Sequence, residues 1–375
     1  MRRLSGVSGI DLWRERWINW RNRLIADPRF QRAAAASPFT RFIARRRARA
    51  LFDLCAGFVY SQILLACVRL RLFEALAAGP APASQLAARL DLAPDAMRRL
   101  LRAAVSLKLL RALSDDRFAL DDLGASVLGN LSVAAFVEHH ALLYDDLRDP
   151  VALLRGETRT RLSQFWPYAV GDANDLQASA AYSELMARSQ QLIAEDVLDA
   201  YNFGKHKRLL DIGGGEGAFV AAVAARHPGL GLQILDLPPV ARRARDLLAA
   251  QGLARVAVHA GSFVDPALTG VADLVTLIRV LHDHDDAMAQ AALRAAFQAL
   301  EPGGTLLVAE PMADTPGAEA IGEAYFGFYL LAMGSGRARR RDELTLMLQE
   351  AGFTEIRPLP SLRPMFASVL IGRRV

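Results

Sequence analysis

Residues 208–217 read RLLDIGGGEG, a short apolar run that ends in a turn rich in glycine. Apolar residues at helical spacing follow this turn to about Arg226. Glycine is required where a chain turns sharply and a ligand approaches the backbone more closely than a side chain permits. The stretch therefore predicts a strand, a turn that binds a nucleotide through Gly213 and Gly215, and a helix.

Short apolar runs alternate with helical patterns from Lys207 to the end of the chain. Continuously apolar strands joined by helices indicate a mostly parallel sheet that helices cover on both faces. We therefore predict an α/β domain over residues 206–375 with a Rossmann-like sheet of seven mostly parallel strands, in which the last two strands can add an antiparallel edge. The expected strands are Arg208–Ile212, Gly231–Leu237, Val256–His259, Leu274–Val280, Thr305–Glu310, Thr354–Pro358 and Phe366–Ile371.

A mainly helical pattern precedes this domain. Glycine, aspartate and proline near residues 79–82 and 91–94 separate helices, and two short β runs surround residues 114–116. A helix-turn-helix followed by a hairpin predicts a winged-helix domain. The expected organisation is a basic N-terminal extension at 1–50, the winged-helix domain at 51–130, a helical linker that lines the substrate cleft at 131–205, and the α/β domain at 206–375.

The positive charge of the chain is concentrated in its first fifty residues. This segment holds 13 arginines and 3 acidic residues, so its net charge is 13 − 3 = +10 and the remaining residues carry 5 − 10 = −5. Trp13, Trp17 and Trp20 would share one helical face among the arginines, a spacing typical of a segment that lies at a membrane surface. The same face suits packing against a partner subunit, and a solvated basic surface is the third interpretation.

Cysteine content and the length of apolar runs bear on the compartment. Cys55 and Cys67 lie in an apolar helical stretch, which predicts buried free thiols and a reducing cytoplasm. The longest apolar run, Phe58–Val68, is shorter than the roughly 20 residues of a membrane span, so no crossing is expected. Because the chain beyond residue 50 lacks net positive charge, we do not expect a nucleic-acid partner.

Two acidic residues at strand ends extend the predicted nucleotide site. Asp236 lies 236 − 217 = 19 residues beyond the last glycine, where a carboxylate accepts hydrogen bonds from ribose hydroxyls. The turn also satisfies the dinucleotide fingerprint Gly213-x-Gly215-x-x-Ala218, so a dehydrogenase remains an alternative at this point. Asp211 suits a cationic ligand better than a pyrophosphate, which it would repel.

The loops after the third and fourth strands supply the next polar groups. Ser262 and Phe263 are placed to flank an adenine, and residues 279–283 lie beside the reacting centre. His284 with the acidic pair 285–286 suggests a metal site, but these acids suit the start of a helix better, where they favour the dipole. We therefore expect no metal ion.

Together these motifs resemble one enzyme family. The chain is similar to the S-adenosylmethionine-dependent (class I) small-molecule O-methyltransferases of the plant caffeate type. Within them it is most similar to the hydroxyneurosporene (demethylspheroidene) O-methyltransferases of carotenoid synthesis in purple phototrophic bacteria. The residues that carry the resemblance are Asp211–Gly217, Leu235–Pro238, Gly261–Phe263, Arg279–Asp283, Ala309–Pro311, His139–Leu154, Phe165–Tyr168 and Tyr182–Met186, and it extends over the winged-helix domain.

The resemblance implies an enzyme that transfers a methyl group from S-adenosylmethionine and forms a homodimer through its winged-helix domain. It implies that His282 is the general base and that Glu310 orients it. A tertiary alcohol is far less acidic than an imidazolium, so its proton should leave as the carbon–oxygen bond forms. The expected cofactor contacts are Asp211, Gly213, Gly215, Asp236, Ser262, Phe263 and Arg279, and the expected substrate-pocket residues are Phe165, Trp166, Met186 and Tyr325.

Three positions depart from the family pattern. Gly261 stands where plant members carry an acidic adenine contact, Ala338 near where a second glutamate flanks the histidine, and Gly334 where phenol-specific members have asparagine. These departures put a phenolic acceptor in doubt. The resemblance implies an apolar acceptor, the tertiary hydroxyl of a 1-hydroxy carotenoid of the spheroidene and spirilloxanthin pathway, which a cytoplasmic enzyme would collect by peripheral contact with the inner or photosynthetic membrane. A phenolic or polyketide acceptor remains the alternative within the family. An NAD-dependent oxidoreductase and a winged-helix regulator remain the alternatives from other classes.

Overall fold

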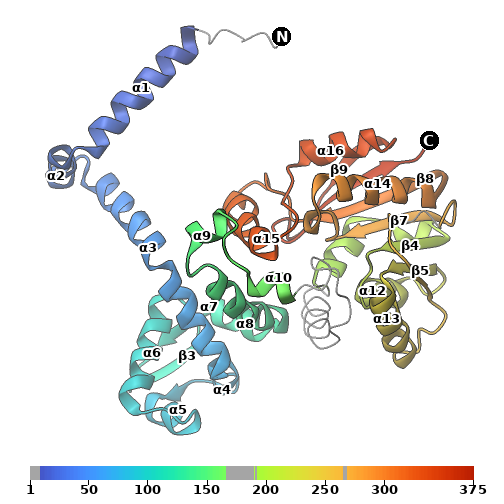
Figure 1. Ribbon diagram of the computed structural model, residues 1–375. Helices are drawn as coiled ribbons and strands as arrows, with labels where there is room; N and C mark the ends of the chain where they lie inside the picture. Colours follow the sequence, from blue (N-terminus) through green and yellow to red (C-terminus); the bar gives the residue numbers. More distant parts are fainter. Residues whose placement is uncertain (1–8, 166–189, 191, 265–267) are drawn as a thin grey trace. The chain divides into compact units, whose positions relative to one another are not determined.

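The computed structural model describes residues 9–165, 190, 192–264 and 268–375 (Figure 1). The chain divides into two compact units, Met1–Ala125 and Ser126–Val375, each with buried apolar side chains of its own. Two of the expected substrate-pocket residues, Trp166 and Met186, lie outside the described residues.

The first unit is mainly helical and ends in a small sheet. Its elements are α1 (Gly9–Ala26), α2 (Pro28–Ala36), α3 (Arg41–Arg69), α4 (Leu72–Ala75), β1 (Ala81–Pro82), α5 (Ala83–Arg89), α6 (Pro94–Ser106), β2 (Leu110–Ala112) and β3 (Arg117–Leu120), and α7 (Asp122–Leu128) crosses the boundary. α5 and α6 form a helix-turn-helix, and β2 and β3 form the hairpin that follows it, so the predicted winged-helix arrangement is present. β1 pairs with β3 and completes a three-stranded sheet.

Helix α3 runs without a break through residue 50, where the composition of the chain changes. Cys67 is buried near its end, whereas Cys55 is exposed, which corrects the expectation of two buried thiols. Among the described helices, α3 is long and apolar enough to cross a membrane by length and composition, and little of its apolar stretch is buried. The sequence analysis expected no membrane-crossing helix because it measured only the uninterrupted apolar run. Scattered polar residues interrupt such a run but do not end the helix. The large exposed apolar side chains of α3 are Phe42, Ile43, Leu51, Phe52, Leu54, Phe58 and Val59.

The second unit begins with short helices and continues as an α/β domain. The elements before the sheet are α8 (Leu131–Asp146), α9 (Pro150–Leu154), α10 (Arg161–Phe165), the helical residues 192–200 and η1 (Phe203–Lys205). The strands are β4 (Arg208–Ile212), β5 (Gly231–Asp236), β6 (Ala257–Ala260), β7 (Ala272–Ile278), β8 (Leu300–Glu310), β9 (Thr354–Leu359) and β10 (Ser368–Arg373). The helices between them are α12 (Ala218–Arg226), α13 (Pro238–Ala250), η2 (Leu281–Asp283), α14 (Asp286–Ala299), η3 (Ala320–Phe326), α15 (Gly327–Met333) and α16 (Arg341–Glu350).

The strands of the second unit form one sheet in the order β6-β5-β4-β7-β8-β10-β9. The strands from β4 to β8 pair in parallel, and β10 pairs antiparallel with both β8 and β9. The predicted antiparallel edge is therefore present, with β10 inserted between β8 and β9. The chain moves outward from β4 through β5 and β6 and then returns to β7 on the other side of β4. In such sheets ligands bind at the carboxyl ends of the strands beside this switch point.

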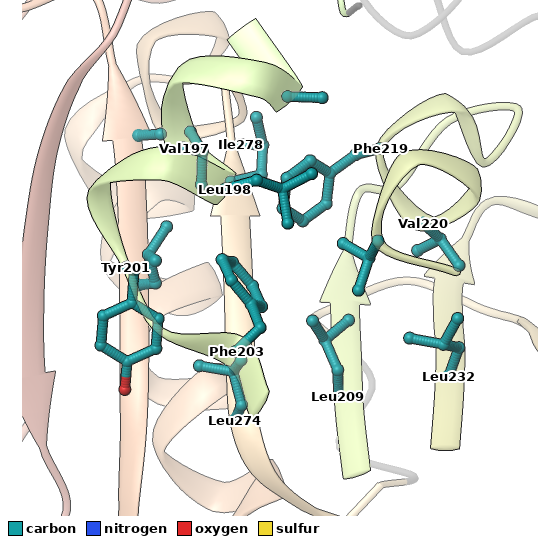
Figure 2. Close-up of a cluster of buried hydrophobic side chains, with 14 of the residues drawn as sticks. Val197, Leu198, Tyr201, Phe203, Leu209, Phe219, Val220, Leu232, Leu274 and Ile278 are labelled. Carbon is teal, nitrogen blue, oxygen red and sulfur yellow. The ribbon is translucent and has the colours of Figure 1, made fainter. Parts of the chain in front are cut away.

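Helices cover both faces of the sheet. Successive residues of a strand point to opposite faces, so neighbouring residues of one strand pack against different helices. Leu209 and Leu274 pack on one face with Phe219 of α12 and with residues 197–203, as Figure 2 shows. The next residue of β4, Leu210, packs on the other face with α14 and α16. Burial on both faces explains why the strands of this sheet appear in the sequence as continuous apolar runs.

Candidate active site

The glycine turn after β4 lies at the switch point of the sheet. Gly213 (φ +70°) donates its N–H to Leu235 O at 2.8 Å, and a Cβ at this position would lie 2.8 Å from Val280 Cγ2. Gly215 also has a left-handed backbone (φ +57°), but no heavy atom of the described residues would lie within 4 Å of its Cβ. The turn is therefore held closely at Gly213 and open at Gly215, as a ligand that approaches the backbone requires.

Asp236, at the end of β5, faces this turn. Its Oδ2 accepts the N–H of Gly215 at 2.8 Å, and its Oδ1 accepts the N–H of Leu237 at 2.7 Å. Burial raises the pKa of Asp236 to about 6, although both hydrogen bonds act to lower it. A carboxylate has about four acceptor positions, so capacity remains for the hydroxyl donors of a ligand such as a ribose.

Asp211, in β4, is the second carboxyl group beside the turn, and it is buried. Thr276 Oγ1 on β7 donates to Asp211 Oδ1 at 2.6 Å. Burial raises the pKa of Asp211 to about 7; the hydrogen bond from Thr276 opposes the rise and the charge of Asp236 adds to it. A nearby cation would favour the ionised form of such a group. The sequence analysis did not predict Thr276 as a site residue. Its signal is a hydroxyl within an otherwise apolar strand, since a buried hydroxyl needs a hydrogen-bond partner.

Ser262 and Phe263 follow β6, beside the end of β5. Gly261 donates its N–H to Asp236 O at 2.9 Å, which ties this loop to β5. The ring of Phe263 meets the ring of His284 edge-on, with the centroids 5.2 Å apart. The loop therefore brings a hydroxyl and an aromatic ring to the edge of the sheet where the sequence predicts an adenine contact.

His282 lies in η2, the short turn that follows β7, and it is buried. Its Nδ1 is 2.6 Å from Oε2 of Glu310, the last residue of β8. Glu310 Oε1 also accepts the N–H groups of Val280 (2.9 Å) and Leu281 (2.7 Å), so one carboxylate binds both the imidazole and the backbone that carries it. Because a carboxylate only accepts, Nδ1 carries the proton, and neutral His282 has an unprotonated Nε2. The structure thus brings together the two residues that the sequence predicts for catalysis.

Asp283 lies on the other side of the imidazole. Its Oδ1 is 3.1 Å from His282 Nε2, so both ring nitrogens face a carboxylate. Burial acts to lower the pKa of His282, but the charges of Asp283 and Glu310 outweigh it, and the pKa is raised. Burial raises the pKa of Asp283 to about 6 against the opposing charge of His282. Asp283 was not among the predicted site residues, because its contact with Nε2 depends on the conformation of the turn.

Arg279 joins β7 to the His282 turn. Its backbone lies in the left-handed region (φ 58°), which residues other than glycine rarely adopt, and its N–H donates to Ala309 O at 2.8 Å. Burial and the charge of Arg279 both act to lower the pKa of His282, against the neighbouring carboxylates, which raise it. Such a backbone outlier within electrostatic reach of a buried histidine is typical of a functional site.

An aromatic cluster adjoins His282. Phe326, at the end of the π-helix η3, meets the imidazole edge-on with the centroids 5.9 Å apart. Tyr325 stacks on Tyr329 at 5.8 Å, and Tyr329 Oη is 2.8 Å from Nε2 of His139 on α8. The hydroxyl of Tyr325 is buried and has no hydrogen-bond partner among the described residues. The expected pocket residue Tyr325 therefore belongs to a wall of rings that reaches His282 through Phe326.

These groups fit a cationic nucleoside ligand such as S-adenosylmethionine. Asp236 retains acceptor capacity for a ribose, and Asp211 is a buried carboxyl group that a positive charge would favour. The open backbone at Gly215 leaves room for the ligand to approach. Within the described ranges, no group of three or more His, Cys, Asp or Glu side chains is arranged to hold a metal ion.

Two family models match the chain. An O-methyltransferase domain matches residues 144–354, and an O-methyltransferase dimerisation domain matches residues 52–129. The demethylspheroidene O-methyltransferase of Cereibacter sphaeroides is 44% identical over 355 residues, which are 94% of this chain and 94% of the relative. That of Rhodobacter capsulatus is 38% identical over 95% of this chain and 90% of the relative.

Solved structures of other methyltransferases have the same architecture as this chain. The mitomycin 7-O-methyltransferase is 29% identical, with a TM-score of 0.71, and covers 88% of this chain and 99% of its own. A methyltransferase of calicheamicin biosynthesis, solved with S-adenosylhomocysteine bound, is 27% identical with a TM-score of 0.73 and covers 88% of this chain and 98% of its own.

Proposed function

This chain belongs to the O-methyltransferase family, and we propose that it methylates the tertiary hydroxyl of a 1-hydroxy carotenoid. It is an enzyme whose methyl donor is S-adenosylmethionine. The match to the family therefore decides against the oxidoreductase and the regulator, the two alternatives that the sequence left open. The observation that carries the choice of acceptor is the similarity to two demethylspheroidene O-methyltransferases along nearly the whole chain.

The cofactor half of the site would hold S-adenosylmethionine at the switch point. When bound, the cofactor supplies a methyl carbon on a cationic sulfur, open to in-line attack by a hydroxyl oxygen. Asp236 would accept hydrogen bonds from the ribose, and Ser262 and Phe263 would contact the adenine. Asp211 and Arg279 would lie toward the methionine end of the cofactor.

His282 would take the proton of the acceptor hydroxyl at Nε2. Glu310 keeps Nδ1 protonated and would stabilise the imidazolium that forms. An alcohol is a far weaker acid than an imidazolium, whose pKa is ordinarily about 6.5, so proton transfer would accompany formation of the carbon–oxygen bond. Asp283 Oδ1 lies 3.1 Å from Nε2, so Asp283 would have to move away from this nitrogen, and Nε2 would have to be unprotonated, before it could take the proton of the hydroxyl.

An apolar acceptor suits the surroundings of His282. The ring of Phe326 contacts the imidazole, and the rings of Tyr325 and Tyr329 continue the same apolar wall from Phe326. The alternative acceptor is a phenol, because more distant relatives include an acetylserotonin O-methyltransferase of Bos taurus.

The test is transfer of a labelled methyl group from S-adenosylmethionine to a 1-hydroxy carotenoid in lipid vesicles, with a catechol assayed in parallel. We expect a labelled carotenoid methyl ether, formed about 10²- to 10⁴-fold more slowly when the His282→Asn variant replaces the wild type. Methylation of the catechol alone would contradict the proposed acceptor and support the phenolic alternative.

The chain carries a dimerisation domain, and the enzyme would form a homodimer through it. Leu51, Phe52, Leu54 and Phe58 on α3 are exposed in the single chain, and an exposed apolar patch marks an interaction surface. Analytical ultracentrifugation should give twice the 40.8 kDa mass of the chain. The double variant Leu54→Asp, Phe58→Asp should shift the protein to monomer, and an unchanged mass would exclude this face from the interface.

The N-terminal helices would contact an anionic membrane from which the carotenoid is taken. Trp13, Trp17 and Trp20 on α1 are 69%, 45% and 61% exposed. Residues 9–50 contain 11 arginines and 3 acidic residues, a net charge of 11 − 3 = +8. Tryptophan favours the interfacial layer of a bilayer, and arginine is attracted to anionic lipids.

Deletion of residues 1–40, which precede α3, should weaken binding to vesicles of anionic lipid while leaving S-adenosylhomocysteine binding unchanged. The triple variant Trp13→Ser, Trp17→Ser, Trp20→Ser retains every arginine. It therefore separates the insertion of tryptophan rings into the bilayer from the attraction of arginines to anionic lipids. Equal partitioning of wild type and both variants would exclude this contact, and a change of mass without a change of vesicle binding would assign the segment to the subunit interface.

A further inference from the structure

Arg339 is a large side chain that is almost completely buried, at 2% exposed. Its Nη1 donates to Leu281 O at 2.5 Å, and its Nη2 donates to His284 O at 2.8 Å. These two carbonyl groups lie on either side of His282 along the chain. We propose that Arg339 is a positioning residue that fixes the His282 turn from its carbonyl side.

The hydrogen bonds of this turn are divided between partners on two sides. Glu310 accepts the N–H groups of residues 280 and 281, whereas Arg339 donates to the carbonyls of residues 281 and 284. Ser335 Oγ donates to the carbonyl between them, Asp283 O, at 3.0 Å. Leu281 O also accepts the N–H of His284 at 3.3 Å, but His284 O would lose the donor that Arg339 provides. A carbonyl that loses its donor away from water is costly, so loss of the guanidinium would free the turn to move toward other donors.

The segment that carries Arg339 also packs on the backbone of the turn. Gly336 has φ +85°, and a Cβ there would lie 2.1 Å from His282 O and 2.6 Å from Asp283 C. The N–H of Ala313 donates to Arg339 O at 3.0 Å, which anchors the segment to the chain that follows β8. Direct backbone contact and three side-chain hydrogen bonds, two from Arg339 and one from Ser335, therefore act on the backbone of the same turn.

Asp286 holds the guanidinium in place. Its Oδ1 accepts from Nε (3.0 Å) and Nη2 (2.9 Å) of Arg339, and Arg337 also donates to this carboxylate. The planar guanidinium thus reaches one carboxylate and two carbonyls at once, which an ammonium on a flexible stem cannot match. Since Asp286 is the first residue of α14, Arg339 links the start of that helix to the turn.

The proposal rests on the proposed role of His282 as base and adds a residue that acts through it. Arg339→Lys should lower kcat about 10- to 100-fold, because a small displacement of Nε2 misaligns proton transfer, with KM and the Kd of S-adenosylhomocysteine nearly unchanged. The matched control is Arg374→Lys, since Arg374 Nη1 donates to the carbonyls of Phe297, Gln298 and Leu300 near the start of β8, away from the turn. Equal kcat per folded molecule in both variants would overturn the proposal.

A second measurement does not need the methyl acceptor. The Nδ1 proton of His282, in its short hydrogen bond to Glu310, should give a downfield proton NMR resonance that is absent in His282→Asn. We expect this resonance to shift or disappear in Arg339→Lys and in Gly336→Ala, and to stay in place in Arg374→Lys. An unchanged resonance in the first two variants would overturn the proposal. If the wild type methylated no acceptor while the resonance responded as expected, the proposed function would fail and the positioning role would stand.

Discussion

The two halves of the site use carboxyl groups in opposite ways. On the cofactor side, Asp211 and Asp236 have raised pKa values and retain acceptor capacity for a ligand. On the proton side, Glu310 accepts from an imidazole and from backbone N–H groups, and Asp283 faces the other ring nitrogen. The first half is completed by its ligand, whereas the second is assembled by the protein alone.

This difference separates the measurements that each half controls. A group that gains its partner from the ligand should govern the binding constant and its dependence on pH. A group whose partners come from the protein, such as the imidazole that Glu310 holds, should govern turnover and leave binding of the cofactor unchanged.

The largest effect is expected for His282→Asn. Removal of the base should lower kcat about 10²- to 10⁴-fold, while calorimetry should give an unchanged Kd for S-adenosylhomocysteine. Turnover close to that of the wild type would remove His282 from the mechanism. A large loss of affinity for S-adenosylhomocysteine would instead show that His282 also contributes to cofactor binding.

Glu310→Gln should follow, with kcat lowered about 100-fold because the imidazole loses the carboxylate that fixes its tautomer. The amide has one acceptor oxygen for the N–H groups and the imidazole that Glu310 now binds, so the free energy of unfolding should fall by about 1–3 kcal/mol. Chemical denaturation and kinetics on the same preparation check both values. Weaker cofactor binding at normal turnover would assign Glu310 to the cofactor half.

Gly213→Ala tests the cofactor half. The left-handed backbone and the contact with Val280 Cγ2 should cost about 1–2 kcal/mol and weaken S-adenosylhomocysteine binding about tenfold. Gly229→Ala is the matched control, because no heavy atom of the described residues would lie within 4 Å of its Cβ and its φ is not positive. At saturating cofactor we expect nearly normal kcat; a large loss would show that Val280 transmits strain to the His282 turn.

The smallest effect is the dependence of cofactor affinity on pH. The pKa of Asp211 is raised to about 7, and a cationic ligand favours the ionised form, so binding should release a proton. Affinity for S-adenosylmethionine, whose sulfur carries the positive charge, should therefore rise by less than about tenfold per pH unit up to about pH 7 and then level off, and affinity for the uncharged sulfur of S-adenosylhomocysteine should depend less on pH. Calorimetry in buffers of different ionisation enthalpy measures the released proton, and Asp211→Asn should flatten the profile.

The same shift has a consequence for the protein without ligand. Because the pKa of Asp211 is higher in the folded than in the unfolded chain, the folded form binds this proton more tightly. Its contribution should make the free energy of unfolding fall as pH rises from about 4 to about 7. Asp211→Asn should reduce this slope, and an unchanged slope would show that Asp211 ionises equally in both states.

Local patterns in the sequence were sufficient for the sheet, whereas the pairing of His282 with Glu310 was predicted from the family resemblance. The strands are apolar throughout because helices cover both faces, and the glycines at 213 and 215 adopt the left-handed backbone that the turn needs. His282 and Glu310 meet because β7 and β8 pair in parallel and both residues stand where these strands end.

Contacts between distant segments could not be predicted in this way. Thr276 meets Asp211 across 65 positions, and Arg339 meets Leu281 across 58. Each residue type is common on a protein surface, so only the folded chain reveals that these are buried. The continuity of α3 through residue 50 was missed for a different reason, because a change of charge does not end a helix.

The π-helix η3 gives this scaffold a route to new acceptors. Hydrogen bonds in a π-helix span five residues instead of four, so loss of one residue within Ala320–Phe326 would restore the α-helical spacing. The preceding residues would then rotate by about 100° relative to α15, and Tyr325 or its replacement would present a different side chain to the acceptor. His282 and Glu310 belong to other elements and would stay in place. On the proposed placement of Tyr325 in the acceptor pocket, the gain or loss of a single codon would change which molecule is methylated and would leave the pair of His282 and Glu310 as it is.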